Sequence, residues 1–271
     1  MADRLVPDEA APGAFYVKFG PTAQSWVDPE RPDLLMFEYV QHVAMVLNHT
    51  LLEEPAERRL RVIHIGGAGM TLPRWVAWRR PGTAQIVCEP DEELTTEVRR
   101  KIPLAQRSGI KVRAVDGRTG VAMMPAEYAE VVIVDAFNGA RVPAELASGS
   151  FLEDLRRIGR HESLVVFNVT DRAPFHWAQR VVAGLRLRWR HVAVGAEAPV
   201  HKGRRFGNLL LLASEARLDL TSIRRDSNRL PFGYRWLDGA ELDGWCAGAE
   251  PFTDADTRHS PEPSGSKLWF A

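Results

Sequence analysis

The sequence is poor in the features that mark several large classes of protein. Two cysteines among 271 residues are too few for a disulfide framework. Lys plus Arg and Asp plus Glu both number 35, so the formal net charge is zero, and the basic excess of an electrostatic nucleic-acid binder is missing. No apolar run approaches the ~20 residues that a membrane span needs, and no charged-then-apolar leader begins the chain. We therefore expect a soluble cytoplasmic protein with neither nucleic-acid nor membrane partners.

Metal ligands and several nucleophile motifs are missing as well. The 8 histidines are scattered without ligand spacing and the two cysteines stand apart, so no metal site is expected. The sequence contains neither a G-x-S-x-G elbow nor a P-loop. Cys88 lies inside a predicted strand and is interpreted as a small core residue.

A regular alternation of strand-like and helix-like segments occupies the middle of the chain. Hydrophobic residues make up 45% of the sequence, enough for a substantial core, and the length predicts one large domain with at most a small appendage. Strands are predicted over residues 61–65, 84–89, 111–116, 131–137, 164–170, 191–196 and 208–213, and helices over 71–79, 92–100, 150–158 and 174–185. Such alternation predicts a parallel sheet with right-handed crossovers. The last two strands follow each other without a helix and should pair as an antiparallel hairpin. The expected fold is therefore α/β, the Rossmann-like seven-stranded sheet of class I S-adenosylmethionine-dependent transferases.

The two ends of the chain differ from this pattern. Residues 1–50 are expected to hold a loose start, a small β-hairpin and a helix over 33–51. Residues 51–246 are expected to form the Rossmann-like catalytic domain, with one or two further helices after its last strand. Residues 247–271 are rich in Gly, Pro, Ser and Asp up to position 266, which predicts a C-terminal tail with little structure of its own.

A glycine-rich turn follows the first strand of the alternation. An apolar run ends in Gly66 and Gly67, and Gly69 follows before the next helix opens. This arrangement brings backbone N–H groups close to a ligand. A third glycine of the dinucleotide pattern would stand at Leu72, so the turn favours an S-adenosylmethionine-type ligand over NAD. The alternative is a tight strand-to-helix turn that binds nothing.

Three carboxylates follow successive strands of the predicted sheet. Glu89 can hold a ribose through both hydroxyls, or it is a charge at a helix start. Asp116, followed by Gly117, can accept from the exocyclic amine of an adenine, or it forms an ordinary Asp-Gly turn. Asp135 would stand beside the sulfonium of the ligand and take a proton from an attacking amine, or it caps the next turn. No metal is needed, because a sulfonium is already a good leaving group.

In these motifs the chain resembles the polyamine aminopropyltransferases, the spermidine synthase family, over roughly residues 25–215. The T-L-P-R run at 71–74 and the G-R-R-x-G-N run at 203–208 are similar to the actinobacterial spermidine synthase-like branch. The resemblance implies a transferase of polyamine biosynthesis that uses decarboxylated S-adenosylmethionine as co-substrate and a small-molecule amine as acceptor. The resemblance also implies a homodimer, since spermidine synthase relatives commonly form dimers or tetramers.

The same resemblance assigns residues. It implies that the glycine turn, Glu89, Asp116 and Gly117 bind the nucleoside and that Asp135 begins the catalytic loop. The N-terminal helix would line the substrate site, and Tyr39, Phe137 and Asn138 would line the acceptor pocket.

Two positions depart from the family pattern. The turn normally carries an Asp where this chain has Ala68, and the catalytic loop normally carries a second Asp where it has Asn138. A diamine with two positive charges should want both carboxylates. The change at Ala68 also removes a repulsion against the carboxylate of intact S-adenosylmethionine. Three hypotheses therefore stay open: an aminopropyltransferase, an S-adenosylmethionine-dependent methyltransferase, and a non-catalytic nucleoside-binding relative.

Overall fold

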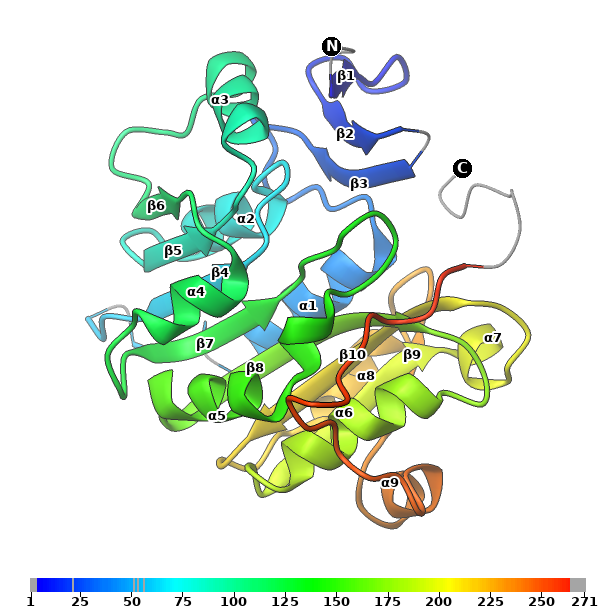
Figure 1. The fold of residues 1–271 in the computed structure, drawn as a ribbon. Helices are drawn as coiled ribbons and strands as arrows, with labels where there is room; N and C mark the ends of the chain where they lie inside the picture. Colours follow the sequence, from blue (N-terminus) through cyan, green and yellow to red (C-terminus); the bar gives the residue numbers. More distant parts are fainter. Residues whose placement is uncertain (1–3, 21, 51, 53, 56, 264–271) are drawn as a thin grey trace.

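A mixed sheet forms the centre of the molecule, and helices cover both of its faces (Figure 1). The computed structural model describes residues 4–20, 22–50, 52, 54–55 and 57–263. The strands of this sheet are β4 (Arg61–Ile65), β5 (Ala84–Cys88), β6 (Ile110–Arg113), β7 (Ala129–Val134), β8 (Gly159–Asp171), β9 (His191–Glu197), β10 (Gly207–Ser214) and β11 (Tyr234–Leu237).

The strand order is β11-β9-β10-β8-β7-β4-β5-β6. The five strands from β8 to β6 are parallel, and β10 is antiparallel to both of its neighbours. The predicted fold class is confirmed, including the terminal antiparallel hairpin. Two details differ: β11 adds an eighth, antiparallel edge strand where only helices were expected, and the one-turn helix α7 (Ala198–His201) lies in the hairpin connection.

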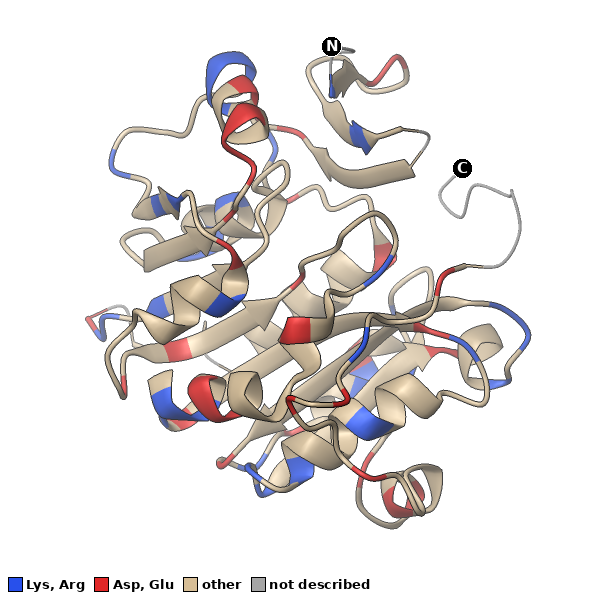
Figure 2. Ribbon diagram, in the orientation of Figure 1, with Lys and Arg blue, Asp and Glu red and all other residues tan. Residues whose placement is uncertain are grey.

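Helices with apolar faces pack on the two sides of the sheet. One side is covered by α1 (Glu38–Asn48), α2 (Thr71–Arg79), α3 (Glu92–Lys101) and α8 (Leu220–Ser227), the other by α4 (Gly117–Ala122), α5 (Gly149–Ile158), α6 (His176–Arg186) and α9 (Gly239–Trp245). The central strand β7 is buried along its whole length, which explains the apolar run Val131–Val134; the buried Glu130 accepts a hydrogen bond from the backbone N–H of Arg61 (2.6 Å). Figure 2 shows how charge follows helix polarity in α3, whose first turn is acidic and whose last turn is basic.

A second, three-stranded sheet precedes α1. It consists of β1 (Leu5–Pro7), β2 (Phe15–Phe19) and β3 (Thr22–Val27) in antiparallel order. The hairpin β2–β3 was predicted, whereas β1 falls in a stretch that was expected to be loose. Leu5 is fully buried against side chains of α3, and Arg4 forms an ion pair with Asp91 at the start of that helix. These contacts fix the small sheet over the glycine turn.

The C-terminal segment of residues 250–263 has no helix or strand, yet it lies against the body of the protein. Figure 1 shows this red segment crossing α6 on its way to the loop after β7. Phe252 is 3% exposed and contacts the guanidinium of Arg180, and Ser260 is completely buried. The apolar end at residues 268–271 lies outside the described residues. The described part of the chain contains no helix long and apolar enough to cross a membrane.

Candidate active site

A cavity of about 400 Å³ opens at the carboxyl ends of β4, β5 and β7. Parallel strands place the residues that follow them at one edge of a sheet, so positions far apart in sequence meet here. Every predicted site residue except Gly69 lines the cavity, namely Gly66, Gly67, Glu89, Asp116, Gly117, Tyr39, Asp135, Phe137 and Asn138. The structure therefore brings the residues predicted to bind the nucleoside and those predicted to bind the acceptor into one cavity. The role of each residue stays a prediction.

The glycine turn is shaped by close packing against neighbouring strands. Gly66 has φ +94°, and a Cβ there would lie 2.2 Å from the backbone oxygen of Asp135. A Cβ at Gly67 would lie 2.9 Å from a methyl carbon of Val87. Only glycine fits at these positions, which keeps the turn close to the ends of β5 and β7. Gly69 lies elsewhere: its hydrogens face the small N-terminal sheet, with Ser25 Oγ 3.0 Å from a Cβ placed there.

Glu89 connects this turn to the end of β5. Its Oε2 accepts hydrogen bonds from the backbone N–H of Gly67 (2.9 Å) and Ala68 (3.2 Å), and its Oε1 accepts from the N–H of Asp91 (3.0 Å). The side chain is 9% exposed and lines the cavity. Glu89 thus holds the turn in place and presents a carboxylate at the position that was predicted for ribose binding.

Asp116 caps helix α4 and lines the cavity at the same time. It accepts hydrogen bonds from Thr119 N (2.8 Å) and Thr119 Oγ1 (2.7 Å). Burial alone would raise its pKa, but the hydrogen bonds from Thr119 outweigh this and lower the pKa, so the carboxylate is ionised. Gly117 lets the helix start approach β4, since a Cβ there would lie 2.2 Å from Ile65 Cγ2. The turn-forming alternative is thus present, and it is compatible with a nucleoside-facing role.

Asp135 is enclosed between a tyrosine and an amide at the end of β7. Its Oδ2 accepts a hydrogen bond from the Tyr39 hydroxyl (3.0 Å), and its Oδ1 accepts from Asn168 Nδ2 (2.9 Å). Burial raises the pKa of Asp135, and these two hydrogen bonds only partly oppose the rise. The pKa of Tyr39 is raised well above its usual value, mainly by burial and secondly by the negative charge of Asp135. Tyr39 is therefore a permanent donor, and Asp135 is a stronger proton acceptor than an exposed carboxylate.

Two residues near Asp135 and the cavity were not predicted from the sequence. Asn168 is 2% exposed, and its Oδ1 is buried without a hydrogen-bond partner among the described residues. An amide within the apolar run of β8 was the signal that could have found it. His64 lines the cavity from β4 and bonds Gln85 through Nε2 (2.8 Å), and burial lowers its pKa to about 4, which keeps the ring neutral.

The loop of residues 136–147 carries Phe137 and Asn138. It is hydrogen-bonded both to the N-terminal sheet and to the C-terminal segment. Within the loop, Asn138 N donates to Arg141 O (2.8 Å). From β3, Gln24 Nε2 donates to Gly139 O (3.0 Å). From the C-terminal segment, Ser260 N donates to Val142 O (3.1 Å), and Ser260 Oγ accepts from Val142 N (2.9 Å). The C-terminal segment is therefore part of the support of the site.

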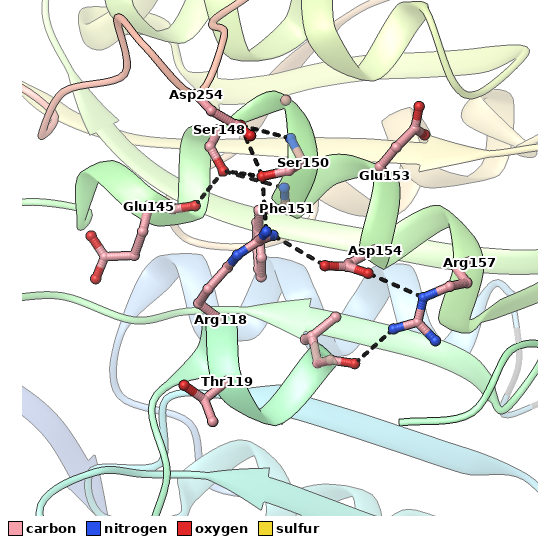
Figure 3. Close-up of polar contacts among 12 residues, drawn as sticks. Arg118, Thr119, Glu145, Ser148, Ser150, Phe151, Glu153, Asp154, Arg157 and Asp254 are labelled. Carbon is pink, nitrogen blue, oxygen red and sulfur yellow. Dashed lines mark hydrogen bonds and ion pairs between the residues drawn. The ribbon is translucent and has the colours of Figure 1, made fainter. Parts of the chain in front are cut away.

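The same segment also reaches the nucleoside side (Figure 3). Asp254 Oδ1 accepts from the N–H (2.9 Å) and the Oγ (2.8 Å) of Ser150 in the first turn of α5. Ser150 Oγ in turn accepts from Arg118 (2.8 Å), which also pairs with Asp154 (3.2 Å). Because Arg118 follows Gly117 directly, this network fixes the start of α4 beside Asp116.

No group of three or more His, Cys, Asp or Glu side chains that could hold a metal ion occurs within the described residues. The absence of a metal from the reaction stays a prediction.

Comparison with known proteins places this geometry in context. No family model matches the sequence, and no curated protein matches it. Among solved structures, a probable spermidine synthase from Corynebacterium glutamicum ATCC 13032 superposes with a TM-score of 0.84 at 27% identity, covering 92% of each chain. The expected resemblance to the spermidine synthase family is confirmed.

Two solved structures of lower identity share the fold of this chain. Human methyltransferase-like protein 13, in complex with SAH, gives a TM-score of 0.57 at 18% identity and covers 74% of this chain and 96% of its own. A spermidine synthase in complex with the transition-state analogue AdoDATO gives 0.50 at 14% identity, with 79% and 75% covered. Both likenesses concern the fold alone.

Proposed function

We propose that this chain transfers an aminopropyl group from decarboxylated S-adenosylmethionine to a small-molecule amine. The observation that carries the proposal is the buried Asp135 carboxylate, which faces the same cavity as the glycine turn and has a raised pKa. The similarity to a probable spermidine synthase at 27% identity supports the same reaction class.

The nucleoside of the donor would occupy the half of the cavity at the ends of β4, β5 and β6. Glu89 offers a carboxylate to the ribose hydroxyls, and Asp116 offers one to the adenine amine. The backbone of Gly66 and Gly67 allows the ligand to approach the sheet edge closely. The donor sulfonium would then lie near Asp135, whose negative charge stabilises it.

The reaction is a nucleophilic displacement at carbon. The nitrogen of a neutral amine forms a bond to the aminopropyl carbon next to sulfur, and the carbon–sulfur bond breaks. The bonding electrons stay on sulfur, which leaves as methylthioadenosine. The proton released from the attacking nitrogen passes to Asp135, while Tyr39 and Asn168 fix the orientation of that carboxylate.

A methyltransferase is the second candidate, and Ala68 is the observation that favours it. Ala68 lines the described cavity with a methyl group, so this position of the turn carries no carboxylate. An intact S-adenosylmethionine carboxylate would meet no repulsion there. The fold likeness to human methyltransferase-like protein 13 in complex with SAH is consistent with this alternative.

Calorimetric titration with decarboxylated S-adenosylmethionine, the intact form and methylthioadenosine, side by side, tests the proposal. Preference for the decarboxylated form, followed by methylthioadenosine release when an amine is added, is the expected result. Preference for the intact form would replace the proposal with methyl transfer. Binding without product from any acceptor would favour a non-catalytic nucleoside-binding relative. A homodimer and a cytoplasmic location stay predictions.

A further inference from the structure

We infer that the acceptor is an amine with one positive charge and an apolar body, in preference to an α,ω-diamine. This inference rests on the proposed function, because it concerns the half of the cavity that lies beyond the donor. The evidence is the distribution of carboxylates and apolar side chains around that half.

Most carboxylates of the cavity wall stand on the donor side and are already engaged. Glu89 is bonded to the glycine turn, and Asp116 caps α4. Asp91 caps α3 through Leu94 N (2.8 Å) and pairs with Arg4. Glu145 is exposed on the 3-10 helix η1 (Ala144–Ala147), which packs beside α4 at the adenine end. These carboxylates follow β5 and β6 or stand on η1, and none of them lies on α1 or at the end of β7.

On the acceptor side, Asp135 is the one carboxylate in the cavity wall within the described residues. The other polar side chains there are neutral and include the hydroxyls of Tyr39 and Ser25 and the amides of Gln24 and Asn138. Glu38, the sequence neighbour of Tyr39, accepts a hydrogen bond from Asn208 Nδ2 (3.4 Å) and is not part of the wall, although its charge contributes to the raised pKa of Tyr39 after burial and Asp135. The acceptor half can therefore neutralise one ammonium group.

Apolar side chains form the rest of this half. Phe37 is 9% exposed, and Val40 and Trp26 are buried beside it. Met36, at 47% exposure, and Phe137 continue the apolar surface towards the opening. An apolar acceptor body would cover these groups, with a gain of roughly 25 cal/mol for each Å² removed from water. A second ammonium in the same place would lose its hydration without gaining a partner.

The test compares n-butylamine, 2-phenylethylamine and 1,4-diaminobutane as ligands of the protein saturated with methylthioadenosine. Calorimetry measures their affinities, so the result does not depend on turnover. We expect both monoamines to bind about tenfold or more tightly than the diamine. In Asn138→Asp, the added carboxylate should strengthen diamine binding by about tenfold, whereas the control Asn138→Ala should not.

The outcomes separate this inference from the proposed function. Equal or tighter binding of 1,4-diaminobutane to the unchanged protein would overturn the inference, even if aminopropyl transfer is then observed. Conversely, the expected order of affinities without methylthioadenosine release from the decarboxylated donor would leave the acceptor class standing and remove the aminopropyltransferase.

Discussion

Tyr39 and Asp135, 96 positions apart in the sequence, are joined by a hydrogen bond of 3.0 Å between the phenol hydroxyl and carboxylate Oδ2. The bond joins α1 to the end of β7 and so links the N-terminal part of the chain to the sheet edge that lines the cavity. Because the hydroxyl donates to the ionised carboxylate, it lowers the pKa of Asp135 against the effect of burial.

Removing this hydroxyl should change the pH dependence of the reaction. In Tyr39→Phe the pKa of Asp135 rises further, and since the base must be ionised, the acidic limb of kcat/KM moves to higher pH. At the optimum, kcat/KM should fall about fivefold for the loss of one hydrogen bond. A pH–rate profile measures both. Tyr128→Phe is the control, because Tyr128 lies outside the cavity and contacts Arg61 through its ring. An unmoved acidic limb in Tyr39→Phe would show that Asp135 is not the titrating base.

Gly66 should tolerate no side chain. In Gly66→Ala the positive φ and the close approach to the Asp135 carbonyl act together, and we expect a loss of about 3 kcal/mol or more in the free energy of unfolding. Gly82→Ala is a matched control, since Gly82 has φ +84° and no atom within 4 Å of the added Cβ. That variant should lose only the strain of about 1–2 kcal/mol. Urea unfolding of both proteins decides, and equal losses would contradict the packing argument.

Ser260 should control the mobility of the loop of residues 136–147. Ser260→Ala leaves the buried N–H of Val142 without its acceptor, so the loop should open more often. Hydrogen exchange at Val142 should become about tenfold faster, with a higher KM for the acceptor and unchanged methylthioadenosine affinity. Thr221→Ala on the exposed side of α8 should change neither. If exchange in the loop stays at its original rate, the C-terminal segment is only a surface attachment.

Features that depend on local sequence patterns could be predicted, whereas features that depend on contacts between distant residues could not. The bounds of β4 and α2 were predicted to the residue, because a buried apolar run and a local helical pattern define them. The meeting of the candidate site residues at one cavity could also be predicted, since residues after parallel strands gather at one sheet edge. By contrast, β11 has four residues and exists through its pairing with β9.

Other misses have the same physical origin. The burial of Leu5 depends on contacts with α3, and the position of Ser260 depends on a loop 118 residues earlier. The hydrogen bond between Asn168 and Asp135 could not be predicted either, because the sequence around an amide in a strand does not identify the carboxylate that it contacts. Local patterns carry no information about such long-range pairs.

The ionised carboxylate of Asp135 should lower the free energy of unfolding at neutral pH. Its pKa is raised in the folded state, so protonation favours folding, and stability is complete below the unfolded pKa and falls as pH rises through the folded pKa. Replacing the carboxylate by a neutral amide removes this loss. Asp135→Asn should therefore melt at a higher temperature than the unchanged protein at pH 7, and the difference should vanish in acid. Thermal denaturation over a pH series measures this, and a lower melting temperature for Asp135→Asn at pH 7 would contradict it.

The same variant gives the most direct test of the proposed reaction. Methylthioadenosine release from decarboxylated S-adenosylmethionine and an amine acceptor would be measured for the unchanged protein and for Asp135→Asn, together with methylthioadenosine affinity. We expect release to be abolished in Asp135→Asn while the methylthioadenosine affinity stays within a few fold. Full turnover in the variant would contradict the assignment of Asp135 as the base.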